Sequence, residues 1–178
     1  MLDSSTNLKS MLSDPSLLQT KAFINNQWVD SESGATFDVK NPARGDVIAQ
    51  VADLSRTDLA KAISSATAAQ KTWAAVSAKE RSNILRAWYN LMMENQADLA
   101  KILTAEMGKP LAEAMGEIAY GSSFVEFFAE EAKRNYGETI PGHQADKRIT
   151  VIKQPIGVAA SITPWNFPTA MITRKCGP

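Results

Sequence analysis

The residues best placed for chemistry lie in a short turn near the end of the chain. A run of small apolar residues (158–162) ends at Pro164, and such an uninterrupted run is typical of a buried parallel strand. Pro168 suits the first position of a helix, where the missing N–H costs nothing. The residues between the two prolines are Trp165, Asn166 and Phe167. Because α/β folds bind ligands at such strand-to-helix turns, we take this turn as the candidate site. On the residues alone, Asn166 has a simpler alternative role as a cap of the following helix.

Three other residues with reactive side chains are assigned structural roles. Cys176 is the only cysteine of the sequence, which excludes an internal disulfide and a cysteine-rich metal site. His143, the only histidine, lies in a polar loop with no second ligand near it in sequence, so we expect a surface position and no metal. Lys109 follows a glycine but lacks the upstream glycine of a phosphate loop, so it is interpreted as a helix-junction residue.

The composition limits the classes of partner. The 178 residues include 19 basic and 19 acidic side chains, so the formal net charge is zero. Since the two signs are interspersed, nothing provides the single-sign field that nucleic acid or an anionic membrane requires. The sequence also contains no apolar run long enough for a membrane span and no signal-peptide pattern at its start. We therefore expect a cytoplasmic protein with neither a nucleic acid nor a membrane as partner.

The first fifty residues are predicted to be mostly β structure after a short arm. Residues 1–20 are polar and serine-rich with a leucine-containing patch, which indicates a frayed or docked helical arm. Asn25 and Asn26 lie between aromatic and β-branched residues, and asparagine tolerates the positive φ of a two-residue hairpin turn. Short alternating strands are predicted around Val39 and over 47–51.

The apolar spacing then changes to that of helices. Four helices are predicted, with starts at Thr57, Ser77, Asn95 and Pro110. The third ends at Gly108, and the fourth runs to Gly137. Gly116 and Gly121 inside the fourth helix each cost about 1 kcal/mol of helix propensity, which predicts close packing against a neighbour.

Two motifs carry a family resemblance. The run 153–168, with Pro164-Trp165-Asn166-Phe167-Pro168 at its end, and the turn Glu106-Met107-Gly108-Lys109-Pro110 resemble the corresponding segments of the NAD(P)-dependent aldehyde dehydrogenases. Segments 127–132 and 170–175 are similar to those of the succinate-semialdehyde dehydrogenase branch. The resemblance runs from about Phe23 to Pro178 and covers only the N-terminal portion of a family member.

The resemblance implies an α/β fold of which the chain is the N-terminal part. It divides the chain into an N-terminal arm (1–20), a hairpin plus helices of the cofactor-binding domain (21–138), an oligomerisation arm (139–156), and the first strand, turn and helix of an incomplete Rossmann-like sheet (157–178). Segment 139–156 contains a polar loop and no apolar stripe, so we expect it to leave the globule as an extended arm or hairpin. Sheet-edge pairing with another subunit would satisfy its backbone groups. A homo-oligomer, dimer or tetramer, is therefore expected.

The resemblance also implies roles for individual residues. In the family a cysteine thiolate attacks the aldehyde, hydride passes to the nicotinamide, and a glutamate-activated water releases the acid. Asn166 matches the asparagine whose amide donates to the developing oxyanion. Arg174 matches the position that binds the distal carboxylate of the substrate, for which a planar guanidinium is well suited. The residues that match the segment along the cofactor are Ile162, Thr163, Pro164, Trp165 and Asn166.

Several functional residues of the family have no match in this sequence. They are the nucleophilic cysteine, the general-base glutamate, the glycine-rich turn at the pyrophosphate and the lysine at the adenosine ribose; Cys176 lacks the nucleophile's Gly-Gln-x-Cys context. We therefore expect a piece of an enzyme that oxidises succinate semialdehyde to succinate with NADP, or NAD, and no activity from these residues alone. The alternatives are an aldehyde dehydrogenase of other specificity and a non-catalytic module.

Overall fold

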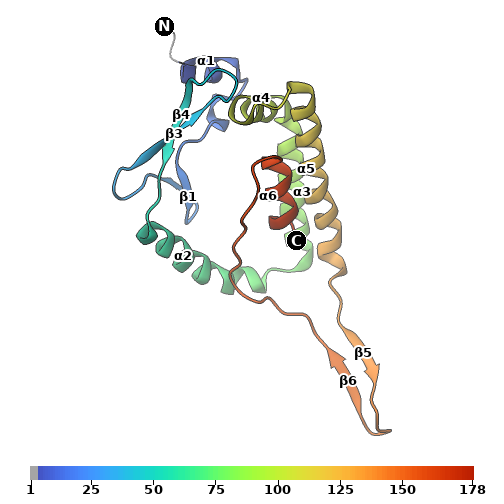
Figure 1. The fold of residues 1–178 in the computed structure, drawn as a ribbon. Helices are drawn as coiled ribbons and strands as arrows, with labels where there is room; N and C mark the ends of the chain where they lie inside the picture. The colour runs from blue at the N-terminus through green and yellow to red at the C-terminus, as the bar shows by residue number, and fades with distance from the viewer. Residues whose placement is uncertain (1–3) are drawn as a thin grey trace.

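The computed structural model describes residues 4–178, with side chains from residue 8 onward. It combines antiparallel strand pairs with a block of helices, which is the mixed architecture expected (Figure 1). The elements are α1 (Ser4–Met11), a 3₁₀ turn η1 (Pro15–Leu17), β1 (Ala22–Ile24), β2 (Gln27–Val29), β3 (Thr36–Lys40), β4 (Val47–Ala52), α2 (Arg56–Ala75), α3 (Ala78–Glu94), α4 (Gln96–Met107), α5 (Leu111–Glu131), a 3₁₀ turn η2 (Ala132–Arg134), β5 (Glu138–Pro141), β6 (Arg148–Val151) and α6 (Pro168–Cys176).

The N-terminal arm is docked on the strands and helices that follow it. The buried cluster beneath the arm consists of Leu8, Leu12, Leu18 and Ile48. The backbone N–H of Asp14 donates to the Asp98 carboxylate of α4 at 2.8 Å. Hydrogen bonds from the Lys101 ammonium and from this amide hold the pKa of Asp98 below its ordinary value. The arm is therefore fixed by both apolar burial and a charged hydrogen bond.

The predicted hairpin in the first thirty residues is confirmed. β1 and β2 pair antiparallel, and Asn25 and Asn26 between them have φ values of 51° and 61°. Both values lie in the left-handed region that a two-residue hairpin turn requires. The pairing of β3 with β4 confirms the strands expected around Val39 and over 47–51.

The helix starts follow capping chemistry more closely than apolar spacing. Helix α3 begins with the predicted capping box of Ser77 and Glu80. Helix α2 begins two residues earlier than expected, since Ser55 rather than Thr57 is its N-cap. Ser55 and Asp58 cap each other reciprocally, and this pair takes the role that the apolar pattern assigned to Thr57.

Helix α5 is the support on which α6 rests (Figure 1). It ends at Glu131 rather than at Gly137, because the chain tightens into the 3₁₀ turn η2. A Cβ added to Gly121 would lie 3.1 Å from Thr169 Cγ2 and 3.3 Å from the backbone of Ala170. The close packing predicted for Gly121 is confirmed. The same prediction is wrong for Gly116, where an added Cβ would meet nothing within 4 Å.

The two glycines of α5 are expected to respond oppositely to larger side chains. Gly121→Val should lower the free energy of unfolding by about 1–3 kcal/mol, because it overpacks the contact with α6. Gly116→Ala should raise it by about 0.5–1 kcal/mol, because alanine restricts the unfolded chain at an open helical position. Urea unfolding of the chain measures both, and equal shifts for the two variants would contradict the packing described for Gly121.

Strands β5 and β6 form an antiparallel hairpin that extends away from the helices (Figure 1). Their register pairs Glu138 with Val151 and Pro141 with Arg148. All eight residues of the two strands are exposed. The expected extended hairpin is thus formed over residues 138–151, one residue earlier than the predicted start of the arm, and its pairing with another subunit stays a prediction.

The buried strand predicted over residues 158–162 is not formed. Residues 152–164 belong to no strand or helix, and Ile156 and Ile162 are 96% and 91% exposed. A parallel strand requires a neighbouring strand for its hydrogen bonds, and the sheets within residues 4–178 are three antiparallel pairs placed elsewhere. The turn and helix that follow do form: α6 begins at Pro168, as predicted.

Candidate functional site

The turn 165–167 joins segment 152–164, which forms no strand or helix, to α6, and its side chains are exposed. Trp165 is 78% exposed, and Asn166 is exposed beside it. No hydrogen bond joins the side-chain amide of Asn166 to any residue whose side chain the structure describes. The amide is therefore free to donate to a ligand.

Another residue caps α6, so Asn166 does not. The N–H groups of Thr169 and Ala170 donate to Oε1 of Glu117 at 2.9 Å and 3.4 Å. Phe167 occupies the N-cap position, and its side chain offers no acceptor. A carboxylate beside the first amides of a helix is favoured by both hydrogen bonding and the helix dipole. The simpler role for Asn166, as the helix cap, is thus taken by Glu117.

Lys109 connects the same carboxylate to the turn. Its ammonium donates to Oε2 of Glu117 at 2.5 Å and to the backbone carbonyl of Asn166 at 3.1 Å. It also lies 3.7 Å from the centre of the Phe167 ring. The Lys109 and Glu117 side chains are only 9% and 1% exposed. Lys109 does lie at a helix junction, as predicted, and its contacts with the candidate site were missed.

The backbone around Lys109 is fixed by its neighbours in sequence. Gly108 ends α4 with φ at 81°, a conformation that favours glycine. A Cβ on Gly108 would lie 3.0 Å from Cγ of Pro42, so the position is crowded as well. Pro110 then starts α5 immediately. The backbone of the Gly108-Lys109-Pro110 turn is therefore restricted, and this restriction limits where the Lys109 side chain can lie.

Arg174 lies on α6 beyond the turn. Its guanidinium carbon is 5.2 Å from the centre of the Phe124 ring of α5. The residue is exposed, and no carboxylate among the described side chains pairs with it. Residues 168–174 span roughly 9 Å of helix, and helical side chains tilt toward the N-terminus. The guanidinium therefore has a stacking surface and a free hydrogen-bonding edge.

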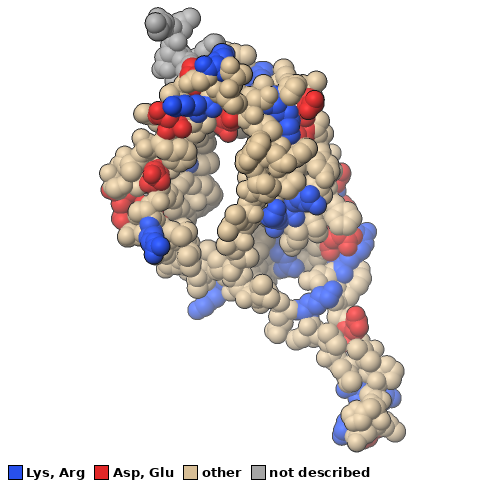
Figure 2. Space-filling view, in the orientation of Figure 1, with Lys and Arg blue, Asp and Glu red and all other residues tan. Residues whose placement is uncertain are grey.

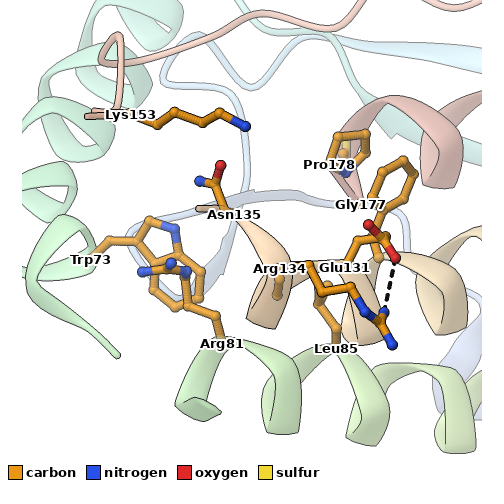
Figure 3. A pocket seen from close by; sticks show the side chains of 12 residues that line it. Trp73, Arg81, Leu85, Glu131, Arg134, Asn135, Lys153, Gly177 and Pro178 are labelled. Atoms are coloured by element: carbon orange, nitrogen blue, oxygen red, sulfur yellow. Dashed lines mark hydrogen bonds and ion pairs between the residues drawn. The ribbon is translucent and has the colours of Figure 1, made fainter. Parts of the chain in front are cut away.

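Cys176 lies at a separate cavity between the ends of α2, α5 and α6 and the start of α3 (Figure 3). The cavity has a volume of about 490 Å³. The described residues that line it are Trp73, Arg81, Leu85, Phe128, Glu131, Ala132, Arg134, Asn135, Lys153, Cys176, Gly177 and Pro178. Glu131, the carboxylate in this lining, is paired with Arg134 at 2.9 Å. The described lining therefore offers no free carboxylate next to the thiol, and the structural interpretation of Cys176 stays a prediction.

The charge visible on one face and the metal-ligand geometry of the described residues indicate no further site. Figure 2 shows Lys and Arg side chains mixed with Asp and Glu over the visible face. Among the described residues, no group of three or more His, Cys, Asp or Glu is arranged to hold a metal. Over the same residues, no helix is both long enough and apolar enough to cross a bilayer.

Comparison with known proteins extends this picture. The sequence model described as the aldehyde dehydrogenase family matches residues 28–178. The chain is 59% identical over 167 residues to the NADP-dependent succinate-semialdehyde dehydrogenase of Escherichia coli (strain K12), a match that covers 94% of this chain and 35% of that protein. It is also 59% identical, with the same coverage, to a glutarate-semialdehyde dehydrogenase of Pseudomonas putida. A crystal structure of an E. coli NADP-dependent enzyme superposes with a TM-score of 0.91 at 58% identity, over 93% of this chain and 34% of that one. The chain thus spans about a third of the length of these relatives.

Proposed function

The chain belongs to the aldehyde dehydrogenase family, and on this premise we propose that it supplies the oxyanion-binding turn and the substrate-binding arginine of an enzyme that oxidises succinate semialdehyde. The observation that carries the proposal is the free side-chain amide of Asn166 at a turn whose helix is capped by Glu117 instead. The nucleophile and the general base are assigned to the part of the family's length that the chain does not span.

Asn166 is the residue of this chain that acts on the reacting oxygen. When a nucleophile adds to an aldehyde, the carbonyl oxygen gains negative charge, and a preorganised N–H donor stabilises that charge. A primary amide donates without taking up or releasing a proton. Because its backbone carbonyl is bound to Lys109, the Asn166 side chain is presented from a fixed peptide.

Arg174 supports the choice of a substrate with a remote carboxylate. The two relatives compared above are named for succinate semialdehyde and glutarate semialdehyde, and both compounds carry a carboxylate at the end opposite the aldehyde. A guanidinium without an internal carboxylate partner suits bidentate binding of such a group. Glutarate semialdehyde, which is one methylene longer, is the second candidate substrate.

The cofactor proposed is NADP, with NAD as the alternative. The match to an NADP-dependent relative supports this order. The segment from Ile162 to Asn166 is compatible with a nicotinamide cofactor, because the apolar side chains of Ile162, just before the oxyanion turn, and Trp165, within it, are exposed. When bound, the cofactor supplies the hydride acceptor for aldehyde oxidation.

We also propose that the enzyme is a homo-oligomer built through the β5–β6 hairpin. Both strands are exposed, and each pairs only with the other among the described residues. Their outer edges therefore have free backbone groups that can extend a sheet of another subunit. The division of the chain into an arm, a helical portion, a hairpin and a final turn-and-helix segment belongs to the same proposal.

The direct test uses a completed enzyme, which is this chain joined to the remainder of the family's length. That remainder is taken from the chain's own coding sequence or from the E. coli relative. The completed enzyme is expected to reduce NADP with succinate semialdehyde and to react more slowly with butyraldehyde, which has the same carbon count but no carboxylate. The 178 residues alone should produce no NADPH.

Absorbance at the NADPH band measures both expectations. Turnover by the 178 residues alone would show that nucleophile and base lie within them. A folded completed enzyme that oxidises no aldehyde would support the alternative of a non-catalytic module.

A further inference from the structure

We propose that Lys109 and Glu117 form a positioning pair that fixes the turn carrying Asn166 to the face of α5. The inference rests on the proposed function for its catalytic consequence. Its structural part concerns only contacts within this chain. Neither residue is expected to touch the substrate.

The first step is that the pair is buried and that its hydrogen bonds reach the turn and the first amides of α6. A buried ion pair is costly unless both groups are fully satisfied. Oε1 of Glu117 accepts the two amides of α6, and Oε2 accepts Lys109. The Lys109 ammonium also donates to the backbone carbonyl of Asn166, and its charge lies over the ring of Phe167. The pair therefore contacts the chain on both sides of the turn.

The second step is that little else fixes this turn among the described residues. Residues 152–164 before it form no strand or helix. After it, α6 is held on α5 by the contact at Gly121 and by the buried residues Ala170 and Thr173. The helix body thus has its own packing, whereas the turn depends on the pair. Loss of the pair should loosen the turn and leave most of α6 in place.

The third step concerns what a loose turn would change. Small displacements of a positioned catalytic group lower turnover steeply, by as much as about 100-fold for 1 Å. Substrate affinity through Arg174 should change less, because Arg174 lies on the part of α6 that Gly121, Ala170 and Thr173 hold. The pair therefore predicts an effect on kcat for all aldehydes with a nearly constant KM for succinate semialdehyde.

The variants are made in the completed enzyme, with a matched control on the same helix. Lys109→Met removes the charge and the donor, and Glu117→Gln keeps an acceptor but removes the charge. Glu113→Gln is the control, because Glu113 is an exposed glutamate in the first turn of α5. Lys109→Arg restores a charged donor at the same junction.

Amide hydrogen exchange provides a readout that does not depend on activity. In Lys109→Met and Glu117→Gln, exchange of the Thr169 and Ala170 amides should be at least about tenfold faster than in the control. Glu117→Gln weakens the acceptor of these amides, and Lys109→Met removes the cation that holds the Glu117 carboxylate in place. For the same variants, kcat should fall by about 10- to 100-fold with both succinate semialdehyde and butyraldehyde. Lys109→Arg should recover most of both effects.

Unchanged exchange at Thr169 and Ala170 in both variants would overturn the positioning role. So would a loss confined to KM for succinate semialdehyde, since that would assign the pair to carboxylate binding. If the completed enzyme oxidises no aldehyde, the proposed function fails, while the exchange experiment still decides whether the pair fixes the turn.

Discussion

Replacing Asn166 with alanine in the completed enzyme is expected to lower kcat by about 10²- to 10³-fold with every aldehyde, which corresponds to roughly 3–4 kcal/mol of transition-state stabilisation. The physical reason is that the oxyanion forms on the aldehyde oxygen, which all substrates share. The turn itself should persist, because its fixed groups are the backbone carbonyl of Asn166 and the amides of α6.

The measurement is steady-state kinetics with succinate semialdehyde and butyraldehyde. Asn83→Ala serves as the control, since Asn83 is an exposed asparagine on α3 away from the turn. Asn166→Asp should be at least as slow as Asn166→Ala, because an ionised carboxylate accepts hydrogen bonds but cannot donate one. An unchanged kcat in Asn166→Ala would remove the oxyanion role and with it the observation on which the proposed function depends.

The parts of the fold that were predicted from sequence are those fixed by short-range chemistry. Asn25-Asn26 produces the hairpin because few other residues adopt two successive positive φ angles. Pro168 begins α6 because proline is preorganised for that position. In contrast, the apolar run 158–162 has the composition of a buried strand, but burial and a hydrogen-bonded ladder depend on neighbouring strands, and none of the strands within residues 4–178 pairs with it.

The residues of the candidate site also differ in whether short-range sequence patterns could predict them. Asn166 and Arg174 were found because they lie in recognisable motifs, and their roles stay predictions. Lys109 lies in the turn that carried the family resemblance, but its partners are 8 and 57 residues away along the chain. Spacing within a motif does not show such contacts. The available signal was Glu117, a charged residue one helical turn from Ala114 and Gly121 on the buried face of α5, since a carboxylate in that position requires a partner.

Replacing Arg174 with alanine in the completed enzyme is expected to lower kcat/KM for succinate semialdehyde by about 30- to 150-fold. The variant removes a charge-assisted bidentate contact worth roughly 2–3 kcal/mol, and 1.4 kcal/mol corresponds to a factor of ten. With butyraldehyde the loss should largely vanish, because that substrate has no carboxylate for the guanidinium to bind. Arg174→Lys should recover only part of the loss, since an ammonium lacks the planar fork.

The neighbouring Lys175 provides the control, because it is an exposed cation at the same end of α6. Lys175→Ala should leave kcat/KM for both substrates nearly unchanged, which separates a specific contact from the general effect of a positive helix end.

The ratio of kcat/KM for succinate semialdehyde to that for glutarate semialdehyde then tests the length of the site. If Arg174 sets the distance from the oxyanion turn to the carboxylate, Arg174→Ala should bring this ratio close to one. If Arg174→Ala slowed butyraldehyde as much as succinate semialdehyde, Arg174 would be a structural residue stacked on Phe124, and the choice of a carboxylate-bearing substrate would lose its support.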